Sequence, residues 1–278
     1  MNHHPIYTRF ERKRCIGTGR HVFDFLGVAT DCRFKKGWEK HALGIGEERV
    51  PNYPPVNEHY FDWIALLTCV SRGYDTFRMG ELGAGWAPWL VRAAFATRQN
   101  PRIKSIELLG VEADPTHYLW MRDHFLDNGL NPNHFHLLHG AVAPAHGTLR
   151  FPKILNPDED YGASIRAATN SSDYIEVPGY TLFDLLDRFS GPVDFLHMDI
   201  QGAEYDVVPA AMGTLKARVK AIMIGTHISN RLDLEMKALF LEHGWKPEMI
   251  FPRNEEVITE YGIVKFGDGF QFWVNPNY

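Results

Sequence analysis

The stretch MGELGAGWAPWLVRAAF, from Met79 to Phe95, joins an apolar run typical of a strand to an apolar run typical of a helix. Gly83 and Gly85 stand in the turn between the two runs, and the acidic Glu81 comes just before them. Glycine adopts positive φ and lets the backbone come close to a ligand. The start of the helix offers backbone N–H groups that have no partner within the helix. This order therefore predicts a ligand site at the end of a strand.

The same alternation continues along the chain. Five short apolar segments have the composition of buried strands: residues 76–82, 106–113, 135–143, 193–200 and 220–227. Segments with helical spacing of apolar residues lie between them: 86–98, 115–128, 180–189, 204–215 and 231–243. Buried strands that alternate with helices are typical of parallel sheets. We therefore predict an α/β fold with a Rossmann-like, doubly wound sheet of mostly parallel strands. The sequence of residues 261–276 is typical of one or two further strands, and we expect them to form an antiparallel edge of the sheet.

The first 56 residues differ from this pattern. They are irregular and end in a proline-rich segment, where Pro51, Pro54 and Pro55 exclude a regular helix. We expect residues 1–56 to form an N-terminal extension that packs on an α/β domain of residues 57–278. Three roles stay open for the extension: a lid, a part of the substrate site, or a contact in a homo-oligomer.

Composition and charge exclude several classes of function. The 29 basic residues are outnumbered by 34 acidic ones, which gives a net charge of −5, so we expect no nucleic-acid partner. No apolar run approaches the roughly 18 residues of a membrane span. The N-terminus lacks the apolar segment of a secretory signal. Cys15, Cys32 and Cys69 are widely spaced and form no CxxC motif, which is typical of reduced thiols. We therefore expect a cytoplasmic protein.

Residues that follow the second and third predicted strands suit a ligand that contains adenosine. Glu112 ends the second strand, where a carboxylate can accept two hydrogen bonds from a ribose diol. Asp114 precedes Pro115 and is better placed to cap the next helix, which leaves Glu112 available. Gly140 and Ala141 belong to the end of the third strand, and their small size would let a flat adenine lie against the backbone.

Glu81 distinguishes between cofactors. A carboxylate beside the glycine turn would repel a pyrophosphate and would favour a cationic ligand with an ammonium and a sulfonium group. This favours S-adenosylmethionine over NAD. The alternative is that Glu81 caps the turn or pairs with an arginine. The residues predicted to bind the cofactor are Glu81, Gly83, Ala84, Gly85, Trp86, Glu112, Ala113, Gly140, Ala141 and Asp199.

Candidate catalytic side chains lie at the ends of the fourth and fifth predicted strands. Asp199 lies at the carboxyl end of the fourth strand and His227 at that of the fifth, and neighbouring strands in a sheet lie about 5 Å apart. Methyl transfer to a hydroxyl needs alignment and the removal of one proton. We predict that His227 is the base and that Asp199 orients it, and the reverse assignment stays open. His197 lies on the same strand as Asp199, and we expect it to be a packed core histidine.

A second hypothesis for the same residues is a metal site. Asp199 and His227, with Glu204 as a third ligand, would hold a divalent ion such as Mg²⁺ and lower the pKa of the acceptor hydroxyl.

Several motifs together resemble the FkbM-type methyltransferases, a branch of the Rossmann-like enzymes that use S-adenosylmethionine. The motifs are ELGAG at 81–85, GVEADP at 110–115, HGAVAPAHGTLRF at 139–151, VDFLHMDIQGAEYDVV at 193–208 and IGTH at 224–227. The resemblance covers residues 76–245, and its most specific part is DIQGAE. His197 stands where the family usually has lysine, and Gln201 stands where it usually has glutamate.

The resemblance implies that residues 57–278 form a class I methyltransferase domain. It further implies O-methylation of a hydroxyl in a sugar, a glycan or another natural product. The predicted acceptor-binding residues are Tyr161, Gln201 and Glu204, and the aromatic residues suited to stacking on a sugar are Trp38, Trp86, Trp89 and Tyr161. Two alternatives stay open: an NAD-linked oxidoreductase on the same fold, and a cofactor-binding module without catalysis.

Overall fold

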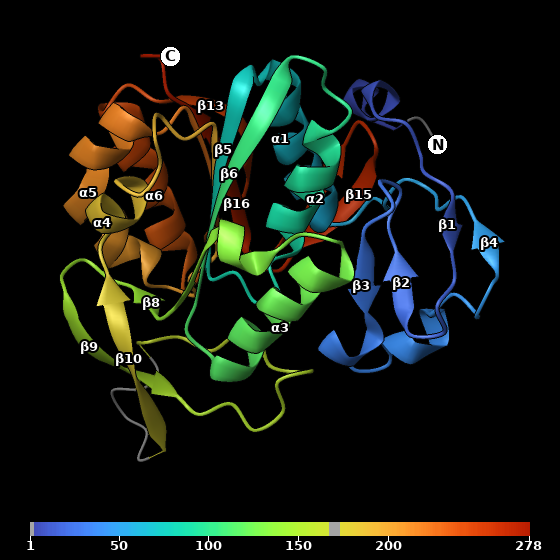
Figure 1. The fold of residues 1–278 in the computed structure, drawn as a ribbon. Helices are drawn as coiled ribbons and strands as arrows, with labels where there is room; N and C mark the ends of the chain where they lie inside the picture. The colour runs from blue at the N-terminus through green and yellow to red at the C-terminus, as the bar shows by residue number, and fades with distance from the viewer. Residues whose placement is uncertain (1–2, 167–172) are drawn as a thin grey trace.

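The computed structural model describes residues 3–166 and 173–278, and its centre is a seven-stranded sheet (Figure 1). Five neighbouring strands run parallel, in the order β7 (His136–His139), β6 (Ile103–Glu112), β5 (Asp75–Leu82), β11 (Phe195–Met198) and β12 (Ala221–Thr226). The sheet continues through β16 (Gly269–Val274), which is antiparallel to both of its neighbours, to β13 (Lys246–Phe251). The predicted Rossmann-like α/β fold is confirmed.

Helices cover both faces of this sheet, as a doubly wound fold requires (Figure 1). One apolar cluster includes buried residues of α1 (His59–Arg72), α2 (Pro88–Thr97) and α3 (Pro115–Asp127). A second cluster includes buried residues of α4 (Leu182–Leu186), α5 (Glu204–Arg218) and α6 (Asn230–Glu242). Asp114 caps α3 through the backbone N–H groups of Thr116 and His117, as predicted. Within the two described ranges, no helix is long and apolar enough to cross a membrane.

The antiparallel C-terminal strand lies inside the sheet and not at the predicted edge. β16 pairs with β12 on one side and with β13 on the other, and its Phe270, Phe272 and Trp273 are all buried, as expected of a strand covered on both faces. The edge is β13, whose first three residues are exposed and include Pro247, a residue that cannot donate to a further strand.

The predicted strand at 135–143 divides at Gly140. Its first half is β7, and its second half, β8 (Ala141–Val142), leaves the main sheet for a smaller one with β9 (Gly147–Pro152) and β10 (Tyr174–Tyr180). Gly140 has φ +156°, and a Cβ atom there would lie 2.5 Å from the carbonyl oxygen of Pro178. The backbone can therefore change direction at this point only with glycine.

The N-terminal extension is built from short elements. They are η1 (Pro5–Arg9), β1 (Cys15–Ile16), β2 (His21–Phe23), β3 (Ala29–Asp31), η2 (Cys32–Phe34), η3 (Trp38–His41) and β4 (Glu48–Arg49). A separate hairpin, β14 (Glu255–Thr259) and β15 (Gly262–Phe266), lies near the C-terminus. Tyr7 and Phe25 are fully buried in the same apolar cluster as α1, and the Phe25 ring lies 5.0 Å from that of Trp63. The extension and α1 thus share one core.

Asn128, at the end of α3, holds the extension against the sheet domain. Its side-chain oxygen accepts a hydrogen bond from the N–H of Ala29 at 2.8 Å, and its amide donates to the carbonyl of Ala29 at 2.8 Å. The Asn128→Ala substitution leaves both buried backbone groups of Ala29 without partners, so we expect a loss of about 2–4 kcal/mol in the free energy of unfolding. Urea denaturation measures this loss. The exposed Asn277→Ala serves as the control, and an equal effect of both substitutions would contradict the assignment.

Candidate functional site

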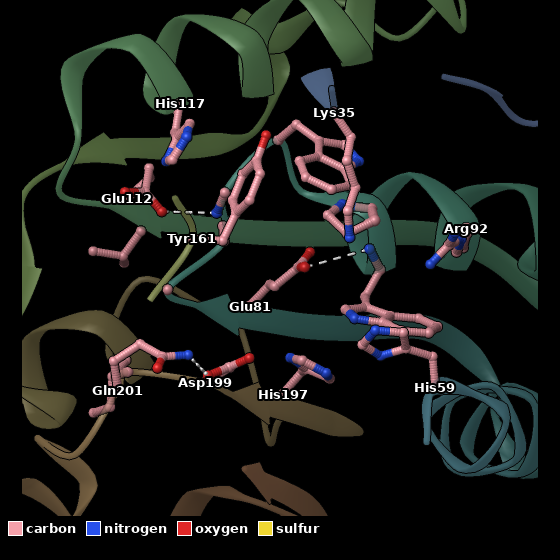
Figure 2. A pocket seen from close by; sticks show the side chains of 18 of the residues that line it. Lys35, His59, Glu81, Arg92, Glu112, His117, Tyr161, His197, Asp199 and Gln201 are labelled. Carbon is pink, nitrogen blue, oxygen red and sulfur yellow. Dashed lines mark hydrogen bonds between the residues drawn. The ribbon is translucent and has the colours of Figure 1, made fainter. Parts of the chain in front are cut away.

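A cavity of about 580 Å³ opens at the carboxyl ends of β5, β6 and β11 (Figure 2). This is the position at which open α/β sheets bind ligands, and its volume is within the usual range for ligand sites, about 300–1,000 Å³. The sequence-predicted residues that line it are Glu81, Gly83, Ala84, Gly85, Trp86, Glu112, Ala113, Gly140, Ala141, Tyr161, Asp199 and Gln201. Two predicted residues, Glu204 and His227, are not part of its lining.

Two carboxylates hold the glycine turn between β5 and α2. Glu81 accepts from the N–H of Leu90 at 2.9 Å and more weakly from that of Trp89 at 3.4 Å, so it caps α2. Glu112 accepts from the N–H of Gly85 at 2.7 Å with one oxygen and from that of Asp114 at 2.7 Å with the other. The capping alternative for Glu81 is therefore what the geometry shows. Both acids line the cavity.

Burial determines the protonation of these two acids. It raises the pKa of Glu81 to about 7, because desolvation outweighs the neighbouring His197 and the backbone N–H groups that favour the anion. It also raises the pKa of Glu112 to about 7, against the N–H groups of Asp114 and Gly85. A bound cation or a pair of hydroxyl donors would therefore favour the ionised form of each acid.

The turn itself touches the end of β11. Gly83 has φ +73°, and a Cβ atom there would lie 1.8 Å from the carbonyl oxygen of Asp199, so only glycine permits this contact. The N–H of Asp199 donates to the carbonyl of Leu82 at 2.9 Å, which continues the pairing of β11 with β5. The side chain of Asp199 is 42% exposed and lies on the cavity floor.

His227 lies between two carboxylates. Its Nε2 is 3.2 Å from Oδ1 of Asp199, and its Nδ1 is 3.0 Å from Oε1 of Glu204. Gln201 also donates to Oδ1 of Asp199, at 2.7 Å. Burial alone would lower the pKa of His227, but the two carboxylates outweigh burial and raise it to about 10. Burial would raise the pKa of Asp199, yet the hydrogen bond from His227 holds it below its ordinary value.

This geometry changes the roles assigned to two predicted residues. Because His227 carries a proton at neutral pH and has a carboxylate on each ring nitrogen, it does not suit the predicted role of base. Glu204 has 0% exposure and accepts hydrogen bonds from Gly202 and from both the backbone N–H and the ring of His227. Its position therefore does not support the predicted contact with an acceptor, and its geometry is that of a support for His227.

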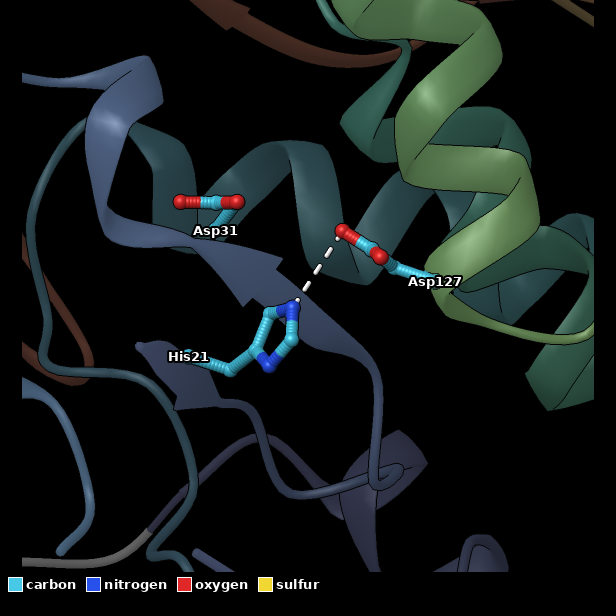
Figure 3. A group of neighbouring side chains, drawn as sticks. All are labelled: His21, Asp31 and Asp127. Carbon is cyan, nitrogen blue, oxygen red and sulfur yellow. Dashed lines mark hydrogen bonds and ion pairs between the residues drawn. The ribbon is translucent and has the colours of Figure 1, made fainter. Parts of the chain in front are cut away.

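The predicted metal site gains no support from the same geometry, since both nitrogens of His227 are occupied by ion pairs. Among the described residues, the group of three side chains placed to share an ion is His21, Asp31 and Asp127, which does not line the cavity (Figure 3). Asp127 already pairs with Arg20 at 2.9 Å, and Asp31 lies 3.4 Å from Arg33. These arginines neutralise the acids, so the cluster is an ion-pair contact between the extension and α3.

Sequence analysis missed a second pairing of acid and histidine on the cavity floor. Asp62, in the first turn of α1, lies 3.3 Å from Nε2 of His197 and 3.4 Å from Nδ1 of His59. His59 and His197 line the cavity. Asp62 and His197 are 135 residues apart, and no local motif joins them. The sequence signal for His197 was the strand alternation, which predicts that His197 and Asp199 lie on the same face of the sheet. No such signal pointed to Asp62.

The extension and a loop close over the cavity together. The hydroxyl of Tyr161 donates to the carbonyl of Phe34, and its ring stacks on His117 with centroids 4.4 Å apart. Lys36 pairs with Glu159 at 2.6 Å. Cavity residues from the extension that sequence analysis did not assign to the site are Phe23, Asp24, Phe25, Lys35, Asn52, Tyr53, Pro54 and Pro55.

The raised pKa of His227 predicts a pH dependence of stability. A histidine whose pKa is about 10 when folded and about 6.5 when unfolded contributes most below pH 6.5, and this contribution is lost as the pH rises toward 10. The free energy of unfolding should fall more steeply over this interval in the wild type than in His227→Gln. Urea titrations between pH 6 and 10 measure the difference. The exposed His136→Gln is the control, and parallel curves for wild type and His227→Gln would contradict the assignment.

The family described as Methyltransferase FkbM domain matches residues 89–260. A relative in Jannaschia sp. (strain CCS1), itself provisionally assigned as a methyltransferase, is 32% identical over 243 residues, which cover 83% of this chain and 84% of the relative.

Two solved structures are similar at lower identity. A methyltransferase FkbM from Methylobacillus flagellatus KT is 13% identical over 73% of this chain and 44% of that chain, with a TM-score of 0.45. An O-methyltransferase from Bacillus cereus in complex with SAH is 13% identical over 79% of this chain and 82% of that chain, with a TM-score of 0.44. On the family match and the 32% identity, the chain belongs to the FkbM methyltransferases and is an enzyme dependent on S-adenosylmethionine.

Proposed function

We propose that this methyltransferase transfers its methyl group to a hydroxyl of a sugar or glycan. The observation that carries the proposal is the division of the cavity into two ends (Figure 2). Glu112 and His117 lie at one end, and His59 and Arg92 lie at the other. Asp199 lies on the floor between the ends, so one end is available to the cofactor and the opposite end to an acceptor.

The residues at the Glu112 end fit the adenosyl part of S-adenosylmethionine. Each carboxylate oxygen of Glu112 accepts one hydrogen bond from a backbone N–H group. The remaining lone pair of each oxygen can accept a hydrogen bond from a ribose diol. Gly140 and Ala141 present little side chain to a flat ring. Glu81 would attract the ammonium or sulfonium group of the cofactor through the negative charge of its ionised carboxylate. When bound, the cofactor supplies a methyl group on a cationic sulfur.

The same contacts speak against a dinucleotide. A pyrophosphate needs free N–H groups in the glycine turn and at the start of the following helix. In this chain, Glu112 takes the N–H of Gly85, and Glu81 takes that of Leu90. A phosphate at this turn would therefore meet two carboxylates, which disfavours the alternative of an NAD-linked oxidoreductase.

The opposite end suits a sugar because it combines ring faces with hydrogen-bonding groups. The rings at this end include Trp63 and Trp89, which line the cavity. Trp86 contacts Trp38 and Tyr161 edge-to-face, with ring centroids 5.9 and 4.8 Å away, and this aromatic wall extends to the other end, where Tyr161 stacks on His117. Arg92 lies over the ring of Trp63 at 4.6 Å and pairs with Asp24 at 3.3 Å. Sugars present apolar ring faces and hydroxyl groups together, and aromatic and charged side chains match both features.

Asp199 is the residue that we assign to the acceptor on the cavity floor. His227 and Gln201 fix its carboxylate and keep it ionised, so it can accept a hydrogen bond from an acceptor hydroxyl and orient the oxygen for attack. His227 is then a positioning residue. Gln201, which adopts φ +52°, lines the same floor and would bind the acceptor with Asp199.

The cofactor site is tested by calorimetry with S-adenosylhomocysteine, with NADH as a comparison ligand. We expect micromolar binding of S-adenosylhomocysteine alone and a loss of about tenfold or more in affinity for Glu112→Gln, which loses one acceptor oxygen. The exposed Glu242→Gln is the matched control. Binding of NADH in place of S-adenosylhomocysteine would overturn the assignment of the cavity.

The acceptor is tested with a panel of hexoses, deoxyhexoses and their methyl glycosides, by release of S-adenosylhomocysteine. We expect turnover with at least one sugar and a loss of about 100-fold or more in kcat for Asp199→Asn, with cofactor affinity retained. Unchanged turnover in Asp199→Asn would contradict its role. Full biological activity of Asp199→Ala and His227→Ala would favour the non-catalytic module, and loss of turnover on adding EDTA would favour the metal hypothesis.

A further inference from the structure

Two histidines at or just beneath the cavity floor have opposite surroundings: His197 lines the cavity, and His227 lies behind Asp199. His227 has a carboxylate on each ring nitrogen, as described above. His197 is 4% exposed, and its Nε2 faces Asp62 at 3.3 Å. Its Nδ1 is buried and has no hydrogen-bond partner within residues 3–166 and 173–278. A buried polar atom without a partner is costly, so it needs an explanation.

The protonation of Asp62 determines which nitrogen of His197 carries hydrogen. Burial would raise the pKa of Asp62, but hydrogen bonds from His197 and then His59 outweigh burial and lower it. An ionised carboxylate can only accept, so Nε2 of a neutral His197 donates to it. The lone pair of the neutral ring is then on Nδ1, the nitrogen that is left without a partner.

His197 is also fixed in place and faces the site. Its ring stacks on Trp89, with centroids 5.5 Å apart and an interplanar angle of 30°. It lines the cavity and lies beside Asp199, two residues further along the same strand (Figure 2). Its register partner on β5 is Glu81. The ring is therefore held between an orienting acid and the floor on which the acceptor would lie.

We propose that His197 is the general base of methyl transfer and that Asp62 is its positioning residue. The inference rests on the proposed O-methylation and deepens it. Nδ1 of His197 takes the proton of the acceptor hydroxyl as that oxygen forms its bond to the methyl carbon. The bond from carbon to sulfur breaks, and its electron pair stays on sulfur. The products are a methyl ether and S-adenosylhomocysteine, and the positive charge of the sulfonium is now on the imidazolium.

The charged groups around His197 fit this transfer. Asp62 on α1, Glu81 on β5 and Asp199 at the end of β11 are carboxyl groups on the elements packed against it, so the proton taken from the acceptor would lie among acids. Arg92 on α2 and His59 on α1 are the basic groups nearby, and each is paired with an acid, Asp24 or Asp62. General-base catalysis of this kind is worth about 10²–10⁴-fold in rate.

The first test needs no acceptor. Histidine ¹⁵N NMR of the complex with S-adenosylhomocysteine at pH 8 reports which ring nitrogen carries hydrogen. We expect His197 to be the neutral tautomer with hydrogen on Nε2, and the two tautomers to mix in Asp62→Asn, where the carboxylate charge is absent. A neutral ring with hydrogen on Nδ1 would overturn the proposal, because that nitrogen could not accept a proton.

The second test uses the best sugar of the acceptor panel. His197→Gln can still donate to Asp62 but has no basic nitrogen, so kcat should fall by about 100-fold or more with the affinity for S-adenosylhomocysteine unchanged. Added imidazole should restore turnover in His197→Gly, which a purely structural role would not allow. His136→Gln is the control. An unchanged kcat in His197→Gln would contradict the assignment of His197 as the general base.

The two proposals fail in different ways. If the wild type binds S-adenosylhomocysteine but methylates no sugar, the proposed acceptor class is wrong, and the NMR measurement still decides the tautomer of His197. If sugars are methylated and His197→Gln is fully active, O-methylation stands and the base lies elsewhere.

Discussion

Carboxylates hold the backbone between β5 and α2, and the rest of the site is arranged around this contact. Glu112 reaches across from β6 to the N–H of Gly85, and Glu81 turns back to cap α2. The turn is pressed so closely on Asp199 that Gly83 admits no side chain. These contacts join the ends of β5, β6 and β11 into the floor of the cavity. Because acids occupy these N–H groups, the site is electronegative where a dinucleotide site would be electropositive.

Buried acids need partners, and this floor supplies them with histidines. Asp62 meets His59 and His197, and His227 joins Asp199 to Glu204. A histidine between two carboxylates is a fixed cation, because losing its proton would leave the buried Glu204 and the partly exposed Asp199 without a compensating charge. A histidine with one carboxylate keeps its second nitrogen free for chemistry. The number of acids on each ring therefore separates a structural cation from a candidate base.

The features of this site that could be predicted from the sequence are those formed by residues close together in the chain. The turn at Gly83 and Gly85, the acid at Glu112 and the cap at Asp114 follow from strand ends and helix starts, which a short motif contains. The burial of Glu204 could not be predicted, because the same motif places it at the start of the helix that follows Asp199 whether its side chain faces the cavity or the core.

Non-local contacts explain the remaining differences. β16 lies between β12 and β13, but the apolar pattern that predicts a buried strand does not say which strands it pairs with. Asp62 was not assigned to the site because it precedes His197 by 135 residues and sits in an otherwise apolar helix. Only the packing of α1 against the sheet brings the two together, and His197 alone has the appearance of a core residue.

The family match begins at residue 89, and much of the proposed acceptor end lies before it. Lys35 and Trp38 come from the extension, and His59 and Trp63 come from the helix that follows. This segment is not a detachable lid, since its buried rings share the apolar cluster of α1 and α2. Changing the acceptor wall therefore means changing part of the core. On the proposed function, acceptor choice and stability in this enzyme are carried by the same side chains.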